Sequence, residues 1–175
     1  CIRDRKKPLI LAGGGVNISH AGEKLKKFME KENVPVVTTI MGKGAVPTTH
    51  PLYIGNCGMH GKYAANMAVM ECDLLFSIGT RFNDRITGDL NEFAPHAQIV
   101  HIDVDTASIS RNVVVDVPVV ADAGVALEKL LEWAEKKDTA KWQEQIHRWE
   151  KENPLAMRRD LSLIHISEPT RHSLI

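Results

Sequence analysis

The sequence predicts one α/β domain built on a parallel, doubly wound sheet with helices on both faces. Short apolar segments of strand length alternate along the chain with segments whose apolar residues recur at helical spacing, which is the pattern of repeated strand–helix units. Glycines and charged residues follow directly after several of the apolar segments. With 175 residues, the chain is long enough to enclose a hydrophobic core as a single domain.

Strands are predicted where short runs are almost entirely apolar, because a strand covered on both faces has no polar side. The predicted strands span residues 8–12, 34–40, 73–78, 98–102 and 117–120. Right-handed crossovers between parallel strands place all of their carboxyl ends at one edge of the sheet, where ligands bind in folds of this class.

Helices are predicted where apolar residues recur every three or four positions. These helices cover 21–29, 63–70, 127–134 and 142–149, and the last two are separated by a break at Asp138 and Thr139. Ser19 is the predicted N-cap of the first helix. The stretch 41–61 is rich in Gly and Pro and is predicted to be a loop.

The composition argues against several classes of protein. The chain carries 22 basic and 22 acidic residues, without the basic excess that nucleic acids or anionic membranes would require. Its apolar runs are far shorter than the ~20 residues of a membrane helix, and no signal peptide is recognisable. Three widely spaced cysteines favour a reducing compartment, so we expect a soluble cytoplasmic protein.

The last part of the chain changes abruptly in character. Residues 161–171 read LSLIHISEPTR, which resembles the in-frame translation of a sequencing-library adapter. The alternative is an ordinary C-terminal extension. The segment 161–175 is interpreted as a non-native tail that contributes nothing to the fold.

Three glycines, Gly13 to Gly15, follow the first predicted strand. Such glycines let the backbone pass close to a phosphate, although they also serve a tight strand-to-helix turn without any ligand. A nicotinamide-binding domain would further require a G-x-G-x-x-G pattern and an acidic residue closing the second strand. The chain reads GGGVNI, and its second strand ends at Thr38 and Thr39, so that class is disfavoured.

Acidic residues instead follow the later strands. Asp103 comes directly after the strand 98–102 and could bind the hydroxyl groups of an adenosine ribose. Asp105 is interpreted as a cap for the short turn 106–108, and Asp122 either as a contact to a ligand or as a cap for the closing helix. The adenosine end of a nucleotide would then lie over the later strands.

The segment GMHG, residues 58–61, is a further candidate for ligand binding. Its glycines permit close approach of the backbone, and its Met and His side chains suit a flat ring. The spacing from Cys57 to His60 allows a zinc interpretation, but a second pair of ligands is lacking. His96 and His101 are expected near the surface or in loops where their nitrogens are satisfied.

The loop 79–85 follows the third predicted strand and contains Arg81, Asp84 and Arg85. Guanidinium groups bind phosphate or carboxylate through paired hydrogen bonds, and a neighbouring carboxylate can orient them. The loop is therefore predicted to bind an anion, with a solvated, salt-bridged loop as the alternative. No Ser/His/Asp arrangement, P-loop or pair of catalytic acids is recognisable.

Taken together, the motifs resemble the central domain of the acetolactate (acetohydroxyacid) synthase large subunit family, whose members depend on thiamine diphosphate. The resemblance spans about residues 5–160 and is carried by the strings PLILAGGGV, TTIMGKGAVP, HPLYIGNCGMHG, DLLFSIGTRFNDRITG, HIDVDTASI and DVPVVADA, in that order. Other thiamine-diphosphate enzymes share the fold, but GMHG and RFNDRITG resemble the synthase more than pyruvate oxidase or glyoxylate carboligase.

The resemblance implies that the domain carries FAD in an extended pose and in a structural role, without turnover of the flavin. It implies cofactor contacts at Gly13, Gly14, Gly15, Thr39, Gly58, Met59, His60, Gly61, Gly79, Arg81, Ile102, Asp103, Ala121 and Asp122. Met59, His60 and Gly61 would lie near the flavin. Arg81 would lie near the phosphate or the ribityl region, and Asp103 and Asp122 toward the adenosine end.

The resemblance also implies a substrate-side pair. Asp84 and Arg85 match an acid–arginine pair at the edge of the active site, where the arginine meets the carboxylate of the second 2-oxoacid. Asn83 departs from the family pattern, because many members carry Asp at that position.

For the full-length enzyme, the resemblance implies the condensation of two 2-oxoacids, pyruvate with pyruvate or 2-oxobutyrate, in the synthesis of valine, leucine and isoleucine. Thiamine diphosphate and Mg²⁺ would be bound by other domains, so the chain is expected to have no metal site and no activity alone. A homo-oligomer with a small regulatory subunit is implied. Residues 1–137 would form the FAD-binding domain, and 138–160 a helical linker toward a C-terminal domain.

Three alternatives stay open. They are the FAD-binding domain of another thiamine-diphosphate enzyme, an electron-transfer flavoprotein domain, and an interaction domain without a ligand. Reversible reduction of the flavin during turnover would favour electron transfer. The absence of flavin from the purified full-length protein would favour an interaction domain.

Overall fold

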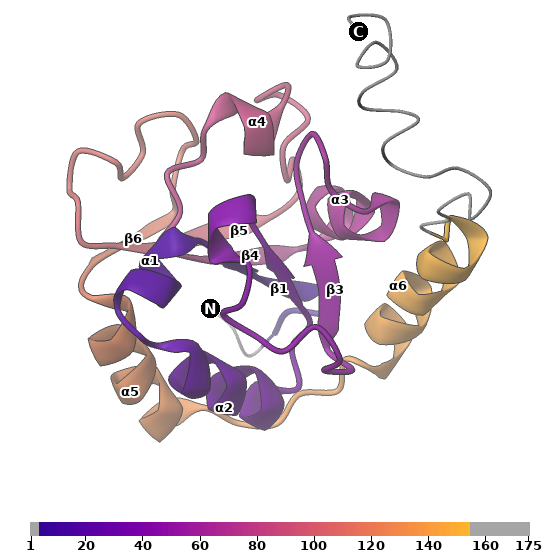
Figure 1. Cartoon of the computed structure of the whole chain (residues 1–175), viewed down its shortest axis with the longest axis horizontal. Coiled ribbons are helices and arrows are strands. Elements are labelled where there is room, and N and C mark those ends of the chain that lie inside the picture. The colour runs from indigo at the N-terminus through magenta and orange to yellow at the C-terminus, as the bar shows by residue number, and fades with distance from the viewer. Residues whose placement is uncertain (1–3, 155–175) are drawn as a thin grey trace, which may run out of the picture.

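The computed structural model describes residues 4–154 (Figure 1). The strands are β1 (Pro8–Ala12), β2 (Val36–Thr38), β3 (Tyr53–Asn56), β4 (Leu74–Ile78), β5 (Gln98–Asp103) and β6 (Val117–Val120). The helices are α1 (Gly14–Ile18), α2 (Gly22–Glu32), the 3₁₀ turn η1 (Ile40–Gly42), α3 (Tyr63–Glu71), α4 (Asp84–Thr87), α5 (Ala123–Trp133) and α6 (Ala140–Glu152). The segment 161–175, which was interpreted as a non-native tail, lies outside the described residues. Residues 155–160, the end of the predicted linker, also lie outside them.

All six strands form one parallel sheet in the order β3-β2-β1-β4-β5-β6. The chain begins in the middle with β1, builds outward to β3, then crosses back to β4 and builds outward to β6 on the other side. The predicted parallel, doubly wound sheet is therefore confirmed. In such sheets, ligands bind at the carboxyl ends of the strands where the winding reverses, which here is between β1 and β4.

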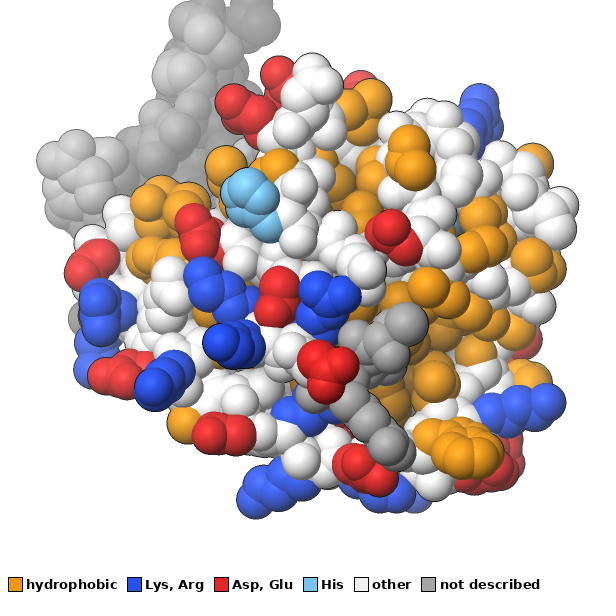
Figure 2. Space-filling view, turned by 180° about the vertical axis from the view of Figure 1, so that it is seen from behind, with side chains coloured by type: hydrophobic (Ala, Val, Ile, Leu, Met, Phe, Trp, Pro, Cys, Tyr) orange, Lys and Arg blue, Asp and Glu red, His pale blue; other side chains and the backbone are white. Residues whose placement is uncertain are grey.

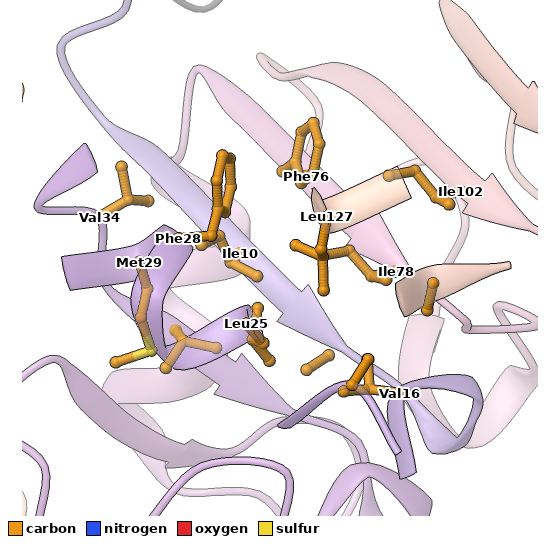
Figure 3. Close-up of a cluster of buried hydrophobic side chains, with 14 of the residues drawn as sticks. Ile10, Val16, Leu25, Phe28, Met29, Val34, Phe76, Ile78, Ile102 and Leu127 are labelled. Carbon is orange, nitrogen blue, oxygen red and sulfur yellow. The ribbon is translucent and has the colours of Figure 1, made fainter. Parts of the chain in front are cut away.

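The central strands are buried on both faces, and β1 contributes alternate side chains to two separate cores. Ile10 and Ala12 belong to the core under α2 and α5, and Leu9 and Leu11 belong to the core under α3 and α6. Figure 3 shows the first core, in which Leu127 of α5 and the side chains of α2 gather around Ile10. This two-sided burial explains why β1 contains no polar residue.

Helix α6 is fastened to the second core by its tryptophans. Trp142 is 2 % exposed, and its indole N–H donates to the carbonyl of Pro8 at 3.1 Å. The amine of Lys7 lies over the Trp142 ring, and Trp149 meets that ring edge to face, with 5.8 Å between the centroids. The segment predicted to be a linker thus contributes a helix that packs on this domain.

Three local predictions differ from the structure. Strand β3 lies within residues 41–61, which were predicted to be a loop. The prediction missed the strand because its sequence YIGN has no apolar run and its Gly55 has φ +143°. Strand β2 is shorter than 34–40, since Thr39 leaves the sheet and its hydroxyl caps η1. Ser19 is not the N-cap of α2: it ends α1, and its hydroxyl donates to Asp122 instead.

Strand β6 is an edge of the sheet and is largely exposed. The N–H of Ala121 donates to the carbonyl of Asp103 on β5. The backbone N–H and C=O groups of successive strand residues point to opposite edges of the strand. Since the N–H of Ala121 points toward β5, the backbone nitrogen of Pro118, three residues earlier, points to the free edge. Val120 is 58 % exposed, and apolar side chains gather on the side of the molecule where β6 lies (Figure 2). Within residues 4–154, no helix is long and apolar enough to span a bilayer.

Candidate functional site

A cavity of about 450 Å³ opens at the carboxyl ends of the strands, over the reversal between β1 and β4. Its walls come from the segments that follow β1, β2, β4, β5 and β6. The predicted cofactor residues that line it are Gly14, Gly15, Thr39, Gly79, Arg81, Ile102, Asp103, Ala121 and Asp122. Its volume falls within the roughly 300–1,000 Å³ of small-molecule sites. The topology thus gathers most of the predicted residues at one place.

The glycines that follow β1 are required by close packing of the backbone. A Cβ at Gly13 would lie 2.1 Å from the carbonyl oxygen of Gly79, and a Cβ at Gly15 would lie 2.7 Å from the Cα of Gly79. The N–H groups of Gly13 and Gly15 donate to the carbonyls of Ile78 and Gly79. These two amides are therefore used within the fold, and Gly13 does not line the cavity.

The loop after β4 presents Arg81 to the cavity from a well-anchored backbone. Arg81 is exposed, whereas its neighbours Thr80 and Phe82 are 3 % and 1 % exposed. Phe82 has φ +47°, which is rare for a bulky residue. Its ring packs edge-on against His101, and Asn112 donates to its carbonyl at 2.8 Å. Arg81 thus lies between two buried residues that are held by side chains from outside the loop.

His101 on β5 is fully buried, so the expectation that it lies at the surface or in a loop is wrong. Its Nε2 lies 2.7 Å from the carbonyl oxygen of Thr80, which can only accept, so Nε2 carries the hydrogen. Its Nδ1 is buried without a hydrogen-bond partner among the described residues. Burial lowers the pKa of His101, against smaller opposing effects of the Thr80 carbonyl and the Asp103 carboxylate. His96, in contrast, is exposed as expected.

Asp103 closes β5 and lines the cavity in a half-buried position. Its Oδ1 accepts the N–H of Asp105, and its Oδ2 lies 3.9 Å from Nε2 of His101. Asp105 accepts the hydroxyl of Ser108 and a backbone N–H of the same turn, so its predicted role as a cap is confirmed. The bond from Ser108 is the main cause that lowers the pKa of Asp105, and the charge of Arg81 adds to it.

Asp122 caps α5 and also lines the cavity. Its Oδ1 accepts the N–H groups of Gly124 and Val125 at 2.8 and 3.2 Å. The hydroxyl of Ser19 donates to the same oxygen at 2.7 Å, and this bond is the largest of the effects that lower the pKa of Asp122. The capping role is therefore confirmed, and the contact to a ligand stays a prediction.

A second cavity, of about 380 Å³, adjoins the first, and Ile86 lines both. The predicted residues that line the second cavity are Gly58, Met59, Asp84 and Arg85. Arg85 lies on α4, a short helix that begins within the segment 79–85, which was predicted to be a loop. The two arginines of that segment thus face different cavities. His60 and Gly61 line neither of the two.

Side-chain amides that the sequence did not single out hold the walls of these cavities. Asn66 of α3 accepts the N–H of Gly58 at 2.8 Å and donates to the carbonyl of Gly58 at 3.0 Å. The N–H of Met59 donates to the carbonyl of Arg85 at 2.9 Å, which joins the GMHG segment to α4. Asn17 of α1 donates to two carbonyls of the η1 turn. The only sequence signal for Asn66 is a polar residue within an otherwise apolar helix.

The pair Cys57 and His60 offers no zinc site. Cys57 is buried, and burial raises the pKa of its thiol to about 12. His60 is exposed. Among residues 4–154, no three His, Cys, Asp or Glu side chains are grouped so that they could hold a metal ion.

The chain is similar to known proteins over most of its length. The model of the thiamine pyrophosphate enzyme central domain matches residues 1–130. The chain is 51 % identical over 153 residues to the probable acetolactate synthase large subunit of Methanocaldococcus jannaschii, covering 86 % of the chain and 26 % of that protein. It is 40 % identical over 172 residues to the acetolactate synthase large subunit of Cyanidium caldarium, covering 94 % and 29 %. It is 40 % identical over 151 residues to the acetolactate synthase isozyme 3 large subunit of Escherichia coli, covering 82 % and 26 %. The chain thus spans roughly a quarter of the length of these relatives.

Proposed function

Because the chain belongs to the thiamine pyrophosphate enzyme family and matches its central domain, we propose that it is the central domain of an acetolactate synthase large subunit and binds FAD. The names of the relatives favour the synthase over other thiamine-diphosphate enzymes. Membership in this family disfavours an electron-transfer flavoprotein and an interaction domain without a ligand.

The two adjoining cavities support FAD as the ligand most directly. Together they follow the carboxyl edge of the sheet from the ends of β5 and β6, past the reversal between β1 and β4, to α3 and α4. A compact ligand would need only one of these cavities, whereas an extended dinucleotide would use the length of both.

The side chains present also suit FAD by their chemistry. Arg81 offers the guanidinium fork that binds a phosphate. Asp103 offers a carboxylate to the hydroxyl groups of a ribose, and the exposed side chains of Ile18, Met41 and Val104 offer apolar walls to flat rings. FAD bound here would serve as a structural element of the full enzyme and would supply no electrons to the reaction.

The remaining predicted contacts divide into two groups. Gly58 and Met59 line the second cavity and are proposed to meet the flavin ring. His60 and Gly61 lie next to them in sequence and are retained as proposed contacts on the basis of the family motif. Gly13 is proposed to act through packing, because its amide is engaged within the fold.

Arg85 and Asp84 are proposed to serve the substrate. Both line the second cavity, on the far side of Ile86 from Arg81. Arg85 would bind the carboxylate of the second 2-oxoacid, and Asp84 would orient the guanidinium. Asn83 lines the first cavity as a neutral residue, so it adds no negative charge beside Arg81.

For the full-length protein we propose the condensation of two molecules of pyruvate, or of pyruvate with 2-oxobutyrate, in branched-chain amino-acid synthesis. Thiamine diphosphate and Mg²⁺ would be held by other domains. The proposed assembly is a cytoplasmic homo-oligomer with a small regulatory subunit. The designation of the relatives as large subunits supports the small subunit. Residues 1–137 would form the FAD-binding domain and 138–160 a helical connection to a C-terminal domain.

Two preparations test this proposal. The full-length protein should form acetolactate from pyruvate with thiamine diphosphate and Mg²⁺, and denaturation should release fluorescent FAD. The chain alone should form no acetolactate, even with all three cofactors added, and should bind FAD only weakly. Turnover by the chain alone would contradict its assignment as one domain. A full-length protein without flavin would contradict the cofactor, and reversible flavin reduction during turnover would favour electron transfer.

A further inference from the structure

His101 is a buried polar side chain next to the site that no contact proposed above uses. It is 0 % exposed and lines neither cavity. It pairs in register with Ser77 on β4, and the hydroxyl of Ser77 is hydrogen-bonded to that of Thr80. His101 therefore lies beside the point where the chain leaves β4 and turns toward Arg81.

We propose that His101 is a positioning residue whose Nε2–H bond to the carbonyl of Thr80 fixes the backbone from which Arg81 reaches a phosphate. The part of this inference that concerns the phosphate rests on the function proposed above. The part that concerns the loop stands on the hydrogen bond itself, which joins β5 to the residue next to Arg81 at 2.7 Å.

Among the contacts that hold the loop, His101 is the side chain that meets the residues on both sides of Arg81. Thr80 is 3 % exposed, so its carbonyl is shielded from water. An apolar residue in place of His101 would therefore leave this buried carbonyl without the hydrogen bond from Nε2. Phe82, on the other side of Arg81, adopts φ +47° and keeps its ring edge-on against the His101 ring, 4.8 Å between centroids. The one imidazole thus supports the residues on both sides of Arg81.

The imidazole is suited to this role only as a neutral ring. Nε2 must donate to Thr80, so a second proton would have to go to Nδ1, which is buried and without a partner among residues 4–154. Burial lowers the pKa of His101 accordingly. The Asp103 carboxylate lies 3.9 Å from Nε2, too far for a hydrogen bond, which leaves Oδ2 of Asp103 able to serve the cavity.

Matched variants separate the hydrogen bond from simple packing. His101→Gln keeps an N–H at about the position of Nε2, whereas His101→Leu removes the donor. His101→Asn places its amide nearer the position of Nδ1 and should behave like His101→Leu, which keeps the test decisive if the apolar variant fails to fold. His96→Leu is the control, because His96 is exposed.

The first measurement needs no cofactor. Trypsin should cut the native chain after Arg81 only when the loop opens, at a rate set by the population of the open form. Loss of the bond to a buried carbonyl should raise that rate about 10-fold in His101→Leu, and by less than about 3-fold in His101→Gln. Cleavage after Arg81 in His96→Leu should stay at the rate of the unaltered chain. Equal rates after Arg81 in all the His101 variants would overturn the proposal.

The second measurement is the dissociation constant of FAD from the full-length protein. His101→Leu should weaken binding about 10-fold, and His101→Gln should restore most of it. In an Arg81→Ala background, His101→Leu should cause no further loss, because the two residues act through one contact. Additive losses would contradict positioning through Arg81. If the unaltered protein binds no FAD, the proposed cofactor is wrong, while the cleavage rates still decide whether His101 fixes the loop.

Discussion

Replacing Arg81 and Arg85 by Ala, one at a time in the full-length protein, should separate cofactor binding from substrate binding. The two residues are close in sequence, yet Arg81 lines the first cavity and Arg85 the second. Both side chains are exposed, so each substitution should change the free energy of unfolding by no more than about 0.5 kcal/mol. Any larger functional effect then reports the lost contact with a ligand.

The size of each effect follows from the charge-assisted hydrogen bond that is removed. Such a bond is worth about 1.5–3 kcal/mol, which is about 10- to 150-fold in affinity or rate. We expect Arg81→Ala to raise the Kd of FAD about 10-fold, with activity restored by excess FAD. We expect Arg85→Ala to keep its flavin and to lose about 10- to 150-fold in kcat/KM.

Bound flavin measured after gel filtration, and kcat/KM for pyruvate measured with and without added FAD, decide between the two roles. Arg81→Lys keeps the charge but loses the fork, and should fall between the wild type and Arg81→Ala. Arg111→Ala, at an exposed arginine that lines neither cavity, should behave as the wild type. Loss of flavin in Arg85→Ala but not in Arg81→Ala would reverse the assignment. If both variants behave as the wild type, the loop binds neither ligand and is the solvated, salt-bridged loop of the alternative interpretation.

Three further substitutions or treatments test the fold around the site. Trp142→Ala should lower the free energy of unfolding in urea by about 3–5 kcal/mol, because a buried ring and its bond to Pro8 are lost together; a loss below about 1 kcal/mol would detach α6 from the domain. Asp122→Ala should cost about 1 kcal/mol at neutral pH. The folded state lowers the pKa of Asp122, so this difference should be complete above the unfolded-state pKa and vanish as the pH falls through the folded-state pKa; a difference that persists in acid would count against the cap. Iodoacetamide in mildly alkaline buffer should leave Cys57 and Cys72 unmodified in the native protein, because burial raises both pKa values to about 12, and mass spectrometry that finds either thiol labelled would refute this.

The parallel sheet could be predicted because the sequences of its central strands are almost entirely apolar. PLILA and LLFSI are buried over their whole length, and short runs of this kind predict strands that are covered on both faces. Strand β3 gave no such signal. Its residues are half-buried at both ends, and it is held in place by pairing with β2, which lies in a separate part of the sequence.

The site could be predicted in outline because topology brings the ends of parallel strands together. Because Asp103 lies at the end of one strand and Arg81 soon after the end of another, both could be expected near one cavity. The side chains that support the site could not be found in this way. His101 and Asn112 act on the Arg81 loop from 21 and 30 residues away, and such bonds leave no periodic pattern in the sequence.

The free edge of β6 has a consequence for the domain during synthesis and storage. A strand edge with an unbroken row of N–H groups is a template on which another chain can extend the sheet and start a fibre. Pro118 faces that edge and has no N–H, so an added strand could not form a continuous ladder there. Pro118→Val would remove this interruption, and we expect it to increase the turbidity of concentrated solutions.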